Sequence, residues 1–256
     1  MDEPKINNKW AGGKPIDVRK KWAGGNEYEN MSLDWHGTDT QELYQANLNK
    51  KKCYQLLKKN SWIDTDITYK FNSYGFRSDE LTDVEILYNG CSNTLGVGLC
   101  LDDTWSKKVS DHFNIKHHNI AVGGSDNTFI TQRSIYWVPK LKPKILVVKE
   151  TIMQRYNWWG SDQSNMQSTA FGKTLDHSIV DISTNPANYE WHYFTFRKLL
   201  QNVCNENNVK LILLPNEQIA KVNDPDHDLA RDLQHRGRKE NQAIAKRVID
   251  EIGNLV

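Results

Sequence analysis

From residue 83 onward, short apolar runs alternate with longer amphipathic stretches. The apolar runs are rich in valine, isoleucine and leucine, which is typical of buried β-strands. They predict strands at 84–89, 115–122, 144–150 and 209–215. The remaining stretches predict helices at 104–113, 127–137, 189–205 and 239–252.

This alternation of strands and helices predicts an α/β fold. Strands separated by helices pair in parallel, and a parallel sheet is covered on both faces. Because crossover connections are right-handed, we expect a three-layer, doubly wound (flavodoxin-like) parallel sheet of about five strands with helices on both faces. Ligands of such sheets bind at the carboxyl ends of the strands.

The first 80 residues show a different pattern. We expect residues 1–80 to form an N-terminal extension, an arm plus a helix, that packs on the main domain at 81–256. The motif KWAGG occurs at 9–13 and again at 21–25, and two copies are too few for a repeat protein. Leucines among basic residues predict the helix at about 40–59.

Two interpretations of the arm remain open. Trp10 and Trp22 could dock on the main domain, which is the interpretation we favour. Together with the basic residues 19–21 they could instead bind nucleic acid or sugar. The formal net charge of +1 gives no overall attraction to nucleic acids or anionic membranes. Neither is therefore an expected partner.

The sequence predicts neither a metal ion nor a cofactor. The four cysteines show no metal-binding spacing and are expected to be free thiols. The segment DPDHD at 224–228 is typical of a polar turn, and His117 and His118 point to opposite faces of a strand. The GVG at 96–98 lacks the dinucleotide-binding spacing.

Candidate chemistry lies just after predicted strands and near the C-terminus. Ser92 follows the first strand, after a glycine that allows a tight turn. Gly124 precedes a predicted helix, where backbone N–H groups can stabilise an anion. Asp232 and His235 are three residues apart and can reach a common point. Together these groups supply the parts of a serine hydrolase.

Each of these features also has a purely structural interpretation. Ser92 could cap the following helix, and Asp232 with His235 could form a solvated helix cap. Cys91 could be a nucleophile, but a cysteine beside a strand end is usually a small buried apolar residue. We interpret Cys91 as packing.

Taken together, the motifs resemble those of the SGNH (GDSL-like) hydrolase family. The serine after a G-x pair resembles the first block, NIAVGG resembles the second, and the D-x-x-H in ARDLQHRG resembles the last. The corresponding residues are Ser92, Asn119, Gly124, Asp232 and His235. The segment FNSYGFRSDE at 71–80 resembles the N-x-x-G-F-R element of many members, and the matches run in family order over about 70–250.

The third block of the family, G-x-N-D, is missing. Its asparagine donates to the oxyanion, but here the 144–150 strand continues into TIMQRYNWW at 151–159. Asn127, Gln154 and Asn93 are the candidate replacement donors. Loss of one such donor typically costs about 10²–10³ in turnover.

The resemblance implies a serine esterase of the acetylesterase type. His235 would take the proton of Ser92, Asp232 would orient the imidazole, and the N–H groups of Ser92 and Gly124 would bind the oxyanion. Members occur in bacteria and tailed phages, and the chain shows no signal peptide or membrane-spanning segment. We therefore expect a cytoplasmic or phage-associated protein.

Aromatic residues suggest a carbohydrate ester as the substrate. Trp158 and Trp159 lie beside a polar run and are expected to contact a glycan, most consistently one that carries O-acetyl groups. Trp191 and Phe194, at helical spacing, are expected in the core. The alternatives are a catalytically weak or inactive SGNH-like domain that binds glycan or has a structural role, and a flavodoxin-like binding module.

Overall fold

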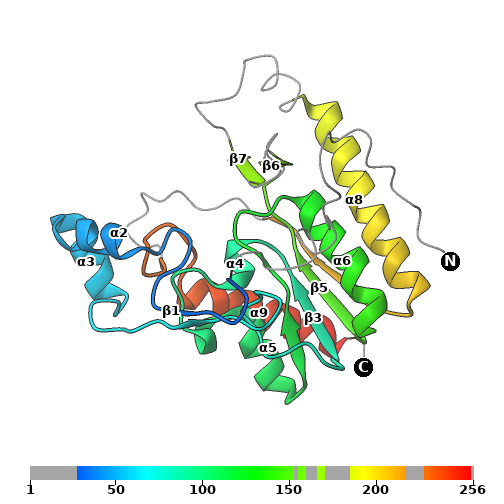
Figure 1. Ribbon diagram of the computed structural model, residues 1–256, viewed down its shortest axis with the longest axis horizontal. Helices are drawn as coiled ribbons and strands as arrows, with labels where there is room; N and C mark the ends of the chain where they lie inside the picture. The colour runs from blue at the N-terminus through cyan, green and yellow to red at the C-terminus, as the bar shows by residue number, and fades with distance from the viewer. Residues whose placement is uncertain (1–27, 153–154, 160–165, 171–184, 217–227, 255–256) are drawn as a thin grey trace.

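A four-stranded parallel sheet forms the centre of the molecule (Figure 1). The computed structural model describes residues 28–152, 155–159, 166–170, 185–216 and 228–254. The strands are β3 (Ile86–Asn89), β4 (His117–Asn119), β5 (Ile145–Lys149) and β8 (Lys210–Leu214). They lie in the order β4-β3-β5-β8, and every neighbouring pair is parallel.

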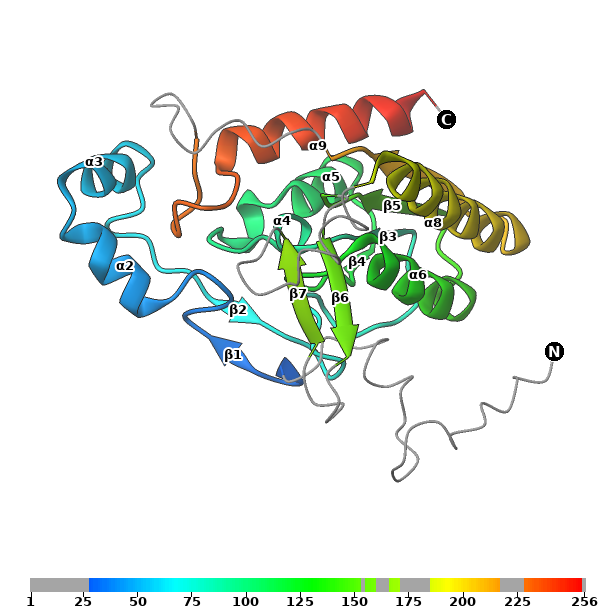
Figure 2. The ribbon, with the colours of Figure 1, turned by 90° about the horizontal axis from the view of Figure 1, so that it is seen from above.

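Helices cover both faces of this sheet, as Figure 2 shows from above. One face carries α5 (Trp105–Phe113) and α9 (Arg238–Gly253), and the other carries α6 (Asn127–Leu141) and α8 (Pro186–Glu206). The predicted three-layer α/β fold is confirmed, with four strands in the central sheet of the described part instead of about five. All four predicted strands and all four predicted helices of this region form.

Alternation along the strands divides the core into two layers. In β3, Leu87 packs into the layer under α6 and α8, whereas Ile86 and Tyr88 pack into the layer under α5 and α9. All four residues of β3 are buried. Burial on both faces explains why the strands appear in the sequence as continuous apolar runs.

The described part of the N-terminal extension packs on the main body. It contains β1 (Ser32–Leu33), which pairs with β2 (Tyr69–Lys70) in antiparallel orientation. Apolar residues of both parts share one core cluster, including Leu57 and Trp62 from the extension and Leu95 and Leu229 from the body. The division into two domains stays a prediction.

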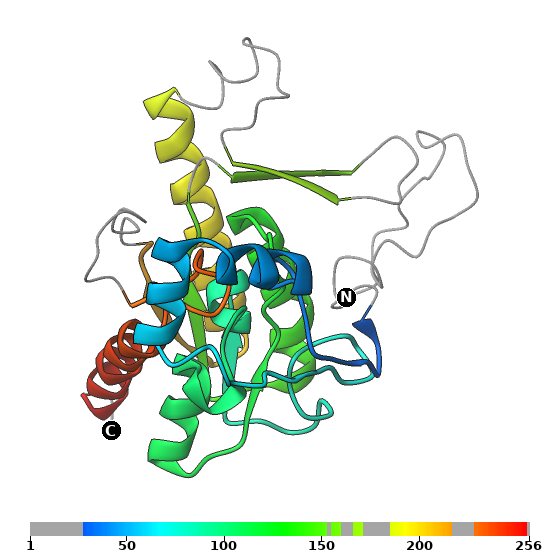
Figure 3. The same ribbon diagram turned by 90° about the vertical axis from the view of Figure 1, so that its left-hand side faces the viewer.

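The single helix expected at 40–59 is wrong. The chain forms α2 (Gln41–Leu48) and α3 (Lys51–Lys59), which Figure 3 shows on the near side of the molecule. Lys50 between them is extended, with φ −103° and ψ 114°. Asn49, a poor helix former, ends α2 and allows this break.

The expected burial of Trp191 and Phe194 is also wrong, since their exposed fractions are 66% and 57%. The side of α8 that faces the core uses residues spaced by three and four positions. These are Phe196, Leu200, Val203 and Cys204. Trp191 and Phe194 fall on the opposite side of the helix, which the sequence spacing alone does not distinguish.

Short elements connect this framework. A one-turn helix, α4 (Ser92–Leu95), follows β3, and a 3-10 turn, η3 (Leu101–Asp103), precedes α5. An antiparallel pair, β6 (Arg155–Trp159) and β7 (Met166–Ala170), follows β5 and was not expected from the sequence. No helix in the described ranges is both long and apolar enough to cross a bilayer.

A buried histidine lies in the described part of the extension. His36 is enclosed by the rings of Tyr28 and Phe71, at centroid distances of 4.6 and 5.0 Å. Within the described residues its Nδ1 has no hydrogen-bond partner. Burial, with a smaller effect of the Arg77 charge, lowers the pKa of His36 to about 4.

We predict that acidification from pH 6.5 to about 4 destabilises the fold through His36. In this range the unfolded chain binds a proton that the folded chain excludes, and below it both bind the proton, so the loss stops. The loss amounts to about 3 kcal/mol at most. Urea unfolding of wild type and His36→Phe at pH 7.5 and 4.5 measures it. The variant should lose less stability than wild type, and equal losses would contradict the assignment.

Candidate active site

The turn after β3 places Ser92 at the carboxyl end of the sheet. Gly90 is required there, because a Cβ at this position would lie 2.2 Å from Thr94 Oγ1 and 3.1 Å from the Lys149 carbonyl oxygen. The Asn89 side chain accepts a hydrogen bond of 2.8 Å from the Gly90 N–H. Ser92 then begins α4, with 9% of its surface exposed.

A second turn brings Asp232 and His235 together. Oδ1 of Asp232 accepts hydrogen bonds of 3.0 Å from the backbone N–H groups of Gln234 and His235. Leu233 has a positive φ of 56°, which tightens the turn. Through these contacts the aspartate organises the loop that carries the histidine.

The three predicted side chains form one hydrogen-bonded chain. Nδ1 of His235 lies 2.6 Å from Oδ2 of Asp232, and Nε2 lies 2.7 Å from Oγ of Ser92. Asp232 is buried at 2% exposure, while the His235 side chain is 15% exposed. The acid is therefore the most deeply buried member of the chain, whereas Ser92 keeps 9% of its surface exposed.

The environment of Asp232 favours its ionised form. Burial opposes ionisation, but hydrogen bonds from His235, Thr38 and the Gln234 backbone outweigh it and lower the pKa of the Asp232 carboxyl. Since an ionised carboxylate only accepts hydrogen bonds, Nδ1 of His235 carries the proton toward it. Nε2 of the neutral ring then presents a lone pair to Ser92, as a general base requires.

Cys91 is buried directly before Ser92, at 4% exposure. Burial acts to raise the pKa of its thiol, but the Asn93 backbone N–H and the charge of Arg155 outweigh burial and lower it. The hydrogen-bonded partner of His235 is nevertheless the hydroxyl of Ser92. The interpretation of Cys91 as a packing residue stays a prediction.

The loop that follows β4 runs beside Ser92. A Cβ on Gly123 would lie 4.0 Å from the Ser92 Cβ, and Gly124 has a positive φ of 75°. Asn119 fixes the start of this loop, because its amide donates to the Thr94 carbonyl at 2.7 Å and accepts from the Ala121 N–H at 3.0 Å. The role of Gly124 as an oxyanion donor stays a prediction.

The candidate replacement donors differ in their surroundings. The Asn127 amide donates to the Thr151 carbonyl at 3.2 Å and accepts from the Thr151 N–H at 2.9 Å, so it joins α6 to the loop after β5. Asn93 lies in α4, next to Ser92. Gln154 lies outside the described residues.

The two tryptophans predicted to contact substrate lie on β6. Trp158 is in register with Gln167, and Trp159 with Met166. Their side chains lie outside what the structure describes. In the described ranges, no group of three or more His, Cys, Asp or Glu side chains could hold a metal ion.

The N-x-x-G-F-R element supports the serine turn. The buried Arg77 donates to the carbonyl oxygens of Gly96 at 2.8 Å and Leu99 at 2.9 Å. Asn72 holds the preceding turn by accepting from the N–H groups of Tyr74 and Phe76. The element thus braces the chain that leaves α4, which gives its sequence pattern a structural reason.

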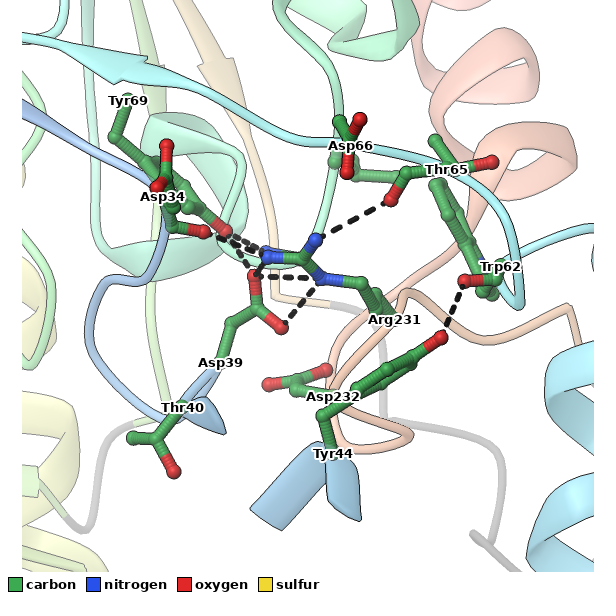
Figure 4. A network of polar contacts seen from close by, with 12 residues as sticks. Asp34, Asp39, Thr40, Tyr44, Trp62, Thr65, Asp66, Tyr69, Arg231 and Asp232 are labelled. Carbon is green, nitrogen blue, oxygen red and sulfur yellow. Dashed lines mark hydrogen bonds and ion pairs between the residues drawn. The ribbon is translucent and has the colours of Figure 1, made fainter. Parts of the chain in front are cut away.

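A buried ion pair that sequence reasoning missed joins the extension to the Asp232 loop (Figure 4). Nη2 of Arg231 lies 2.8 Å from Oδ2 of Asp39, and both side chains are almost fully buried. Tyr69 donates to the same carboxylate at 2.6 Å, and the guanidinium lies 4.1 Å from the centroid of the Trp35 ring. Only the adjacency of Arg231 to Asp232 in sequence could have indicated its importance.

Comparison with known proteins gives matches among solved structures only. No family model and no curated protein matches the chain. The psychrotrophic esterase EstA from Pseudoalteromonas sp. is 13% identical, over 68% of this chain and 98% of its own, with a TM-score of 0.39. A GDSL-like lipase from Bacteroides thetaiotaomicron is 14% identical over 67% of this chain and 64% of its own, with a TM-score of 0.32.

Two carbohydrate-active esterases are among these structures. A family two carbohydrate esterase from Clostridium thermocellum, solved with cellohexaose, is 16% identical over 68% of this chain and 65% of its own, with a TM-score of 0.39. The acetyl xylan esterase Est2A from Butyrivibrio proteoclasticus is 11% identical over 74% and 66%, with a TM-score of 0.36.

We predict that Arg231→Met destabilises the fold by about 3–5 kcal/mol, because it leaves the Asp39 carboxylate buried without its cation. The double variant Arg231→Met/Asp39→Leu should recover part of this loss. Urea unfolding measures both, with Arg247→Met as the control, since that arginine belongs to a pair whose side chains are 43% and 38% exposed. The control should lose no more than about 1 kcal/mol. A similar loss in Arg231→Met and the control would contradict the prediction.

Proposed function

We propose that this protein is a serine esterase of the SGNH type. The observation that supports it best is the hydrogen-bonded chain from Ser92 through His235 to Asp232. It lies at the carboxyl end of a parallel sheet, where α/β proteins bind their ligands. If Asp232 and His235 formed only a solvated helix cap, the imidazole would have no reason to contact Ser92, which is 143 positions away in the chain.

The first half of the proposed reaction forms an acyl-enzyme. Oγ of Ser92 attacks the ester carbonyl carbon while Nε2 of His235 takes the hydroxyl proton. Asp232 stabilises the imidazolium, and the backbone N–H groups of Ser92 and Gly124 bind the oxyanion. When the tetrahedral intermediate collapses, the bond to the alcohol breaks and the alcohol leaves with the proton from Nε2.

The second half releases the acid. Water attacks the acyl carbon and gives a proton to Nε2 of His235, and the bond to Oγ of Ser92 then breaks as the serine regains its proton. The products are the carboxylic acid and free enzyme. Besides the ester and water, the groups that act in this sequence are side chains and backbone N–H groups of the chain.

We propose an O-acetyl group on a carbohydrate as the substrate. The support is the position of Trp158 and Trp159 on β6, which follows the strand next to the one that delivers Ser92. Aromatic side chains combine an apolar face with a polar edge and are common in ligand sites. A small acyl group also suits a serine that is 9% exposed.

One observation favours a second function. The loop after β5 lacks the asparagine of the third block, and the strand instead leads into the buried carboxylate of Glu150. With fewer oxyanion donors the same fold would serve better as a glycan-binding or structural module than as an efficient enzyme. Measured turnover decides between the two.

We predict that Ser92→Ala lowers the turnover of p-nitrophenyl acetate by at least about 10³-fold, because the nucleophile is lost. Cys91→Ala is the matched control and should keep activity within a few-fold of wild type, since it retains the serine. Equal rates for wild type and Ser92→Ala would remove the esterase proposal, and loss in Cys91→Ala alone would identify a thiol nucleophile.

A further inference from the structure

A fourth side chain contacts the proposed catalytic chain, and it comes from the N-terminal extension. Oγ1 of Thr38 lies 2.6 Å from Oδ2 of Asp232 and 3.4 Å from Nδ1 of His235. We propose that Thr38 is a positioning residue for the esterase reaction, and that its hydroxyl fixes the carboxylate that orients His235. This inference rests on the proposed function.

The direction of each hydrogen bond follows from the chemistry of the groups. The Asp232 carboxylate can only accept, so the single hydroxyl proton of Thr38 points to Oδ2. The same oxygen accepts from Nδ1 of His235 at 2.6 Å, while Oδ1 accepts from the two backbone N–H groups of the turn. Among the described residues, two side chains therefore donate to this carboxylate. One is His235 and the other is Thr38.

The extension holds Thr38 in place from both sides. His36 and Asp39 pair through backbone hydrogen bonds of 2.9 and 3.1 Å, which close a tight turn around Gly37 and Thr38. Gly37 has a positive φ of 64°, a conformation that favours glycine. Both flanking residues, His36 and Asp39, are buried. The hydroxyl is thus presented by a fixed turn and not by a free loop.

The ion pair described above connects this turn to its target. Asp39 follows Thr38, and Arg231 precedes Asp232. The two charged residues bind each other through three pairs of atoms. Figure 4 shows Asp39 and Arg231 facing each other with Asp232 close by. A shift of the turn relative to the Asp232 loop would have to separate a buried ion pair, which is strongly unfavourable.

Thr38 and the carboxylate that it contacts differ in exposure. Asp232 is 2% exposed, whereas Thr38 belongs to the exposed residues. Truncation of Thr38 to alanine would let a water molecule reach the carboxylate. That water can donate the hydrogen bond that Thr38 no longer supplies. Valine has nearly the same shape as threonine but cannot donate, so it leaves one lone pair of the carboxylate without a partner.

These differences predict an order of activity. With p-nitrophenyl acetate, Thr38→Ser should retain the wild-type kcat, Thr38→Ala should lose a few-fold, and Thr38→Val should lose about tenfold, with KM little changed. The control is Thr40→Val, which removes the helix cap that Thr40 gives to the Leu43 N–H but leaves Asp232 untouched. It should keep the wild-type kcat.

A readout independent of turnover is the titration of Asp232. Thr38 contributes to the lowered pKa of this carboxyl, so Thr38→Val should raise that pKa relative to Thr38→Ser and Thr40→Val. Side-chain carboxyl ¹³C NMR measures it in the intact protein. A merely structural role for Thr38 would reduce stability without moving this titration.

The outcomes separate this inference from the proposed function. If Ser92→Ala loses activity while Thr38→Val keeps the wild-type kcat and the wild-type Asp232 titration, Thr38 is not a positioning residue. If Ser92→Ala has wild-type activity, the esterase proposal fails, and the NMR titration still decides whether Thr38 fixes Asp232. An equal loss of kcat in Thr38→Val and Thr40→Val would assign the effect to the stability of the extension and overturn the inference.

Discussion

The buried ion pair between Arg231 and Asp39 is the contact on which the arrangement of the candidate site depends. It joins segments that lie 192 positions apart in the chain. Burying two charges costs desolvation energy, so the pair persists because each partner has further contacts. Tyr69 donates to the aspartate, and backbone oxygens of Thr65 and Asp34 accept from the guanidinium.

Together with further contacts, this pair joins the extension to the main body. Trp62 donates to the Leu229 carbonyl at 2.8 Å, and Arg238 stacks on the Trp62 ring at 3.7 Å from its centroid. The loop that carries Asp232 and His235 is therefore enclosed by α9 on one side and by the extension on the other. Its geometry is a property of the whole assembly and not of the local D-x-x-H sequence.

The sheet was predictable, and so was the approach of Ser92, His235 and Asp232 to one another, because each leaves a local pattern. Buried parallel strands give apolar runs, and the glycine before Ser92 reflects a crowded turn that tolerates no Cβ. The break between α2 and α3 was not predictable from periodicity, because one extended residue, Lys50, interrupts a pattern that continues on both sides. The exposure of Trp191 depends on which side of α8 meets α6, and that is set by tertiary packing.

Thr38 and Asp39 could not be identified for a different reason. Their partners lie almost 200 residues away, and a threonine beside an aspartate has the composition of any polar turn. Residues that act through a local motif can be recognised from one sequence. Residues that act by long-range pairing need the fold first.

The end of β5 shows how the site could work without the third block. In place of an asparagine, this strand leads to Glu150, which would place a negative charge near the carboxyl edge of the sheet. Arg197 binds its carboxylate through two hydrogen bonds, of 2.6 and 2.8 Å, and Tyr193 donates to it as well. The charge is therefore neutralised from α8 and, in the proposed esterase reaction, would not oppose a developing oxyanion. Stabilisation of that oxyanion would then fall to backbone N–H groups at the start of α4 and in the loop at 123–124. In the proposed reaction the rate would also depend on how well His235 is held, and thus on the contacts made to Asp232.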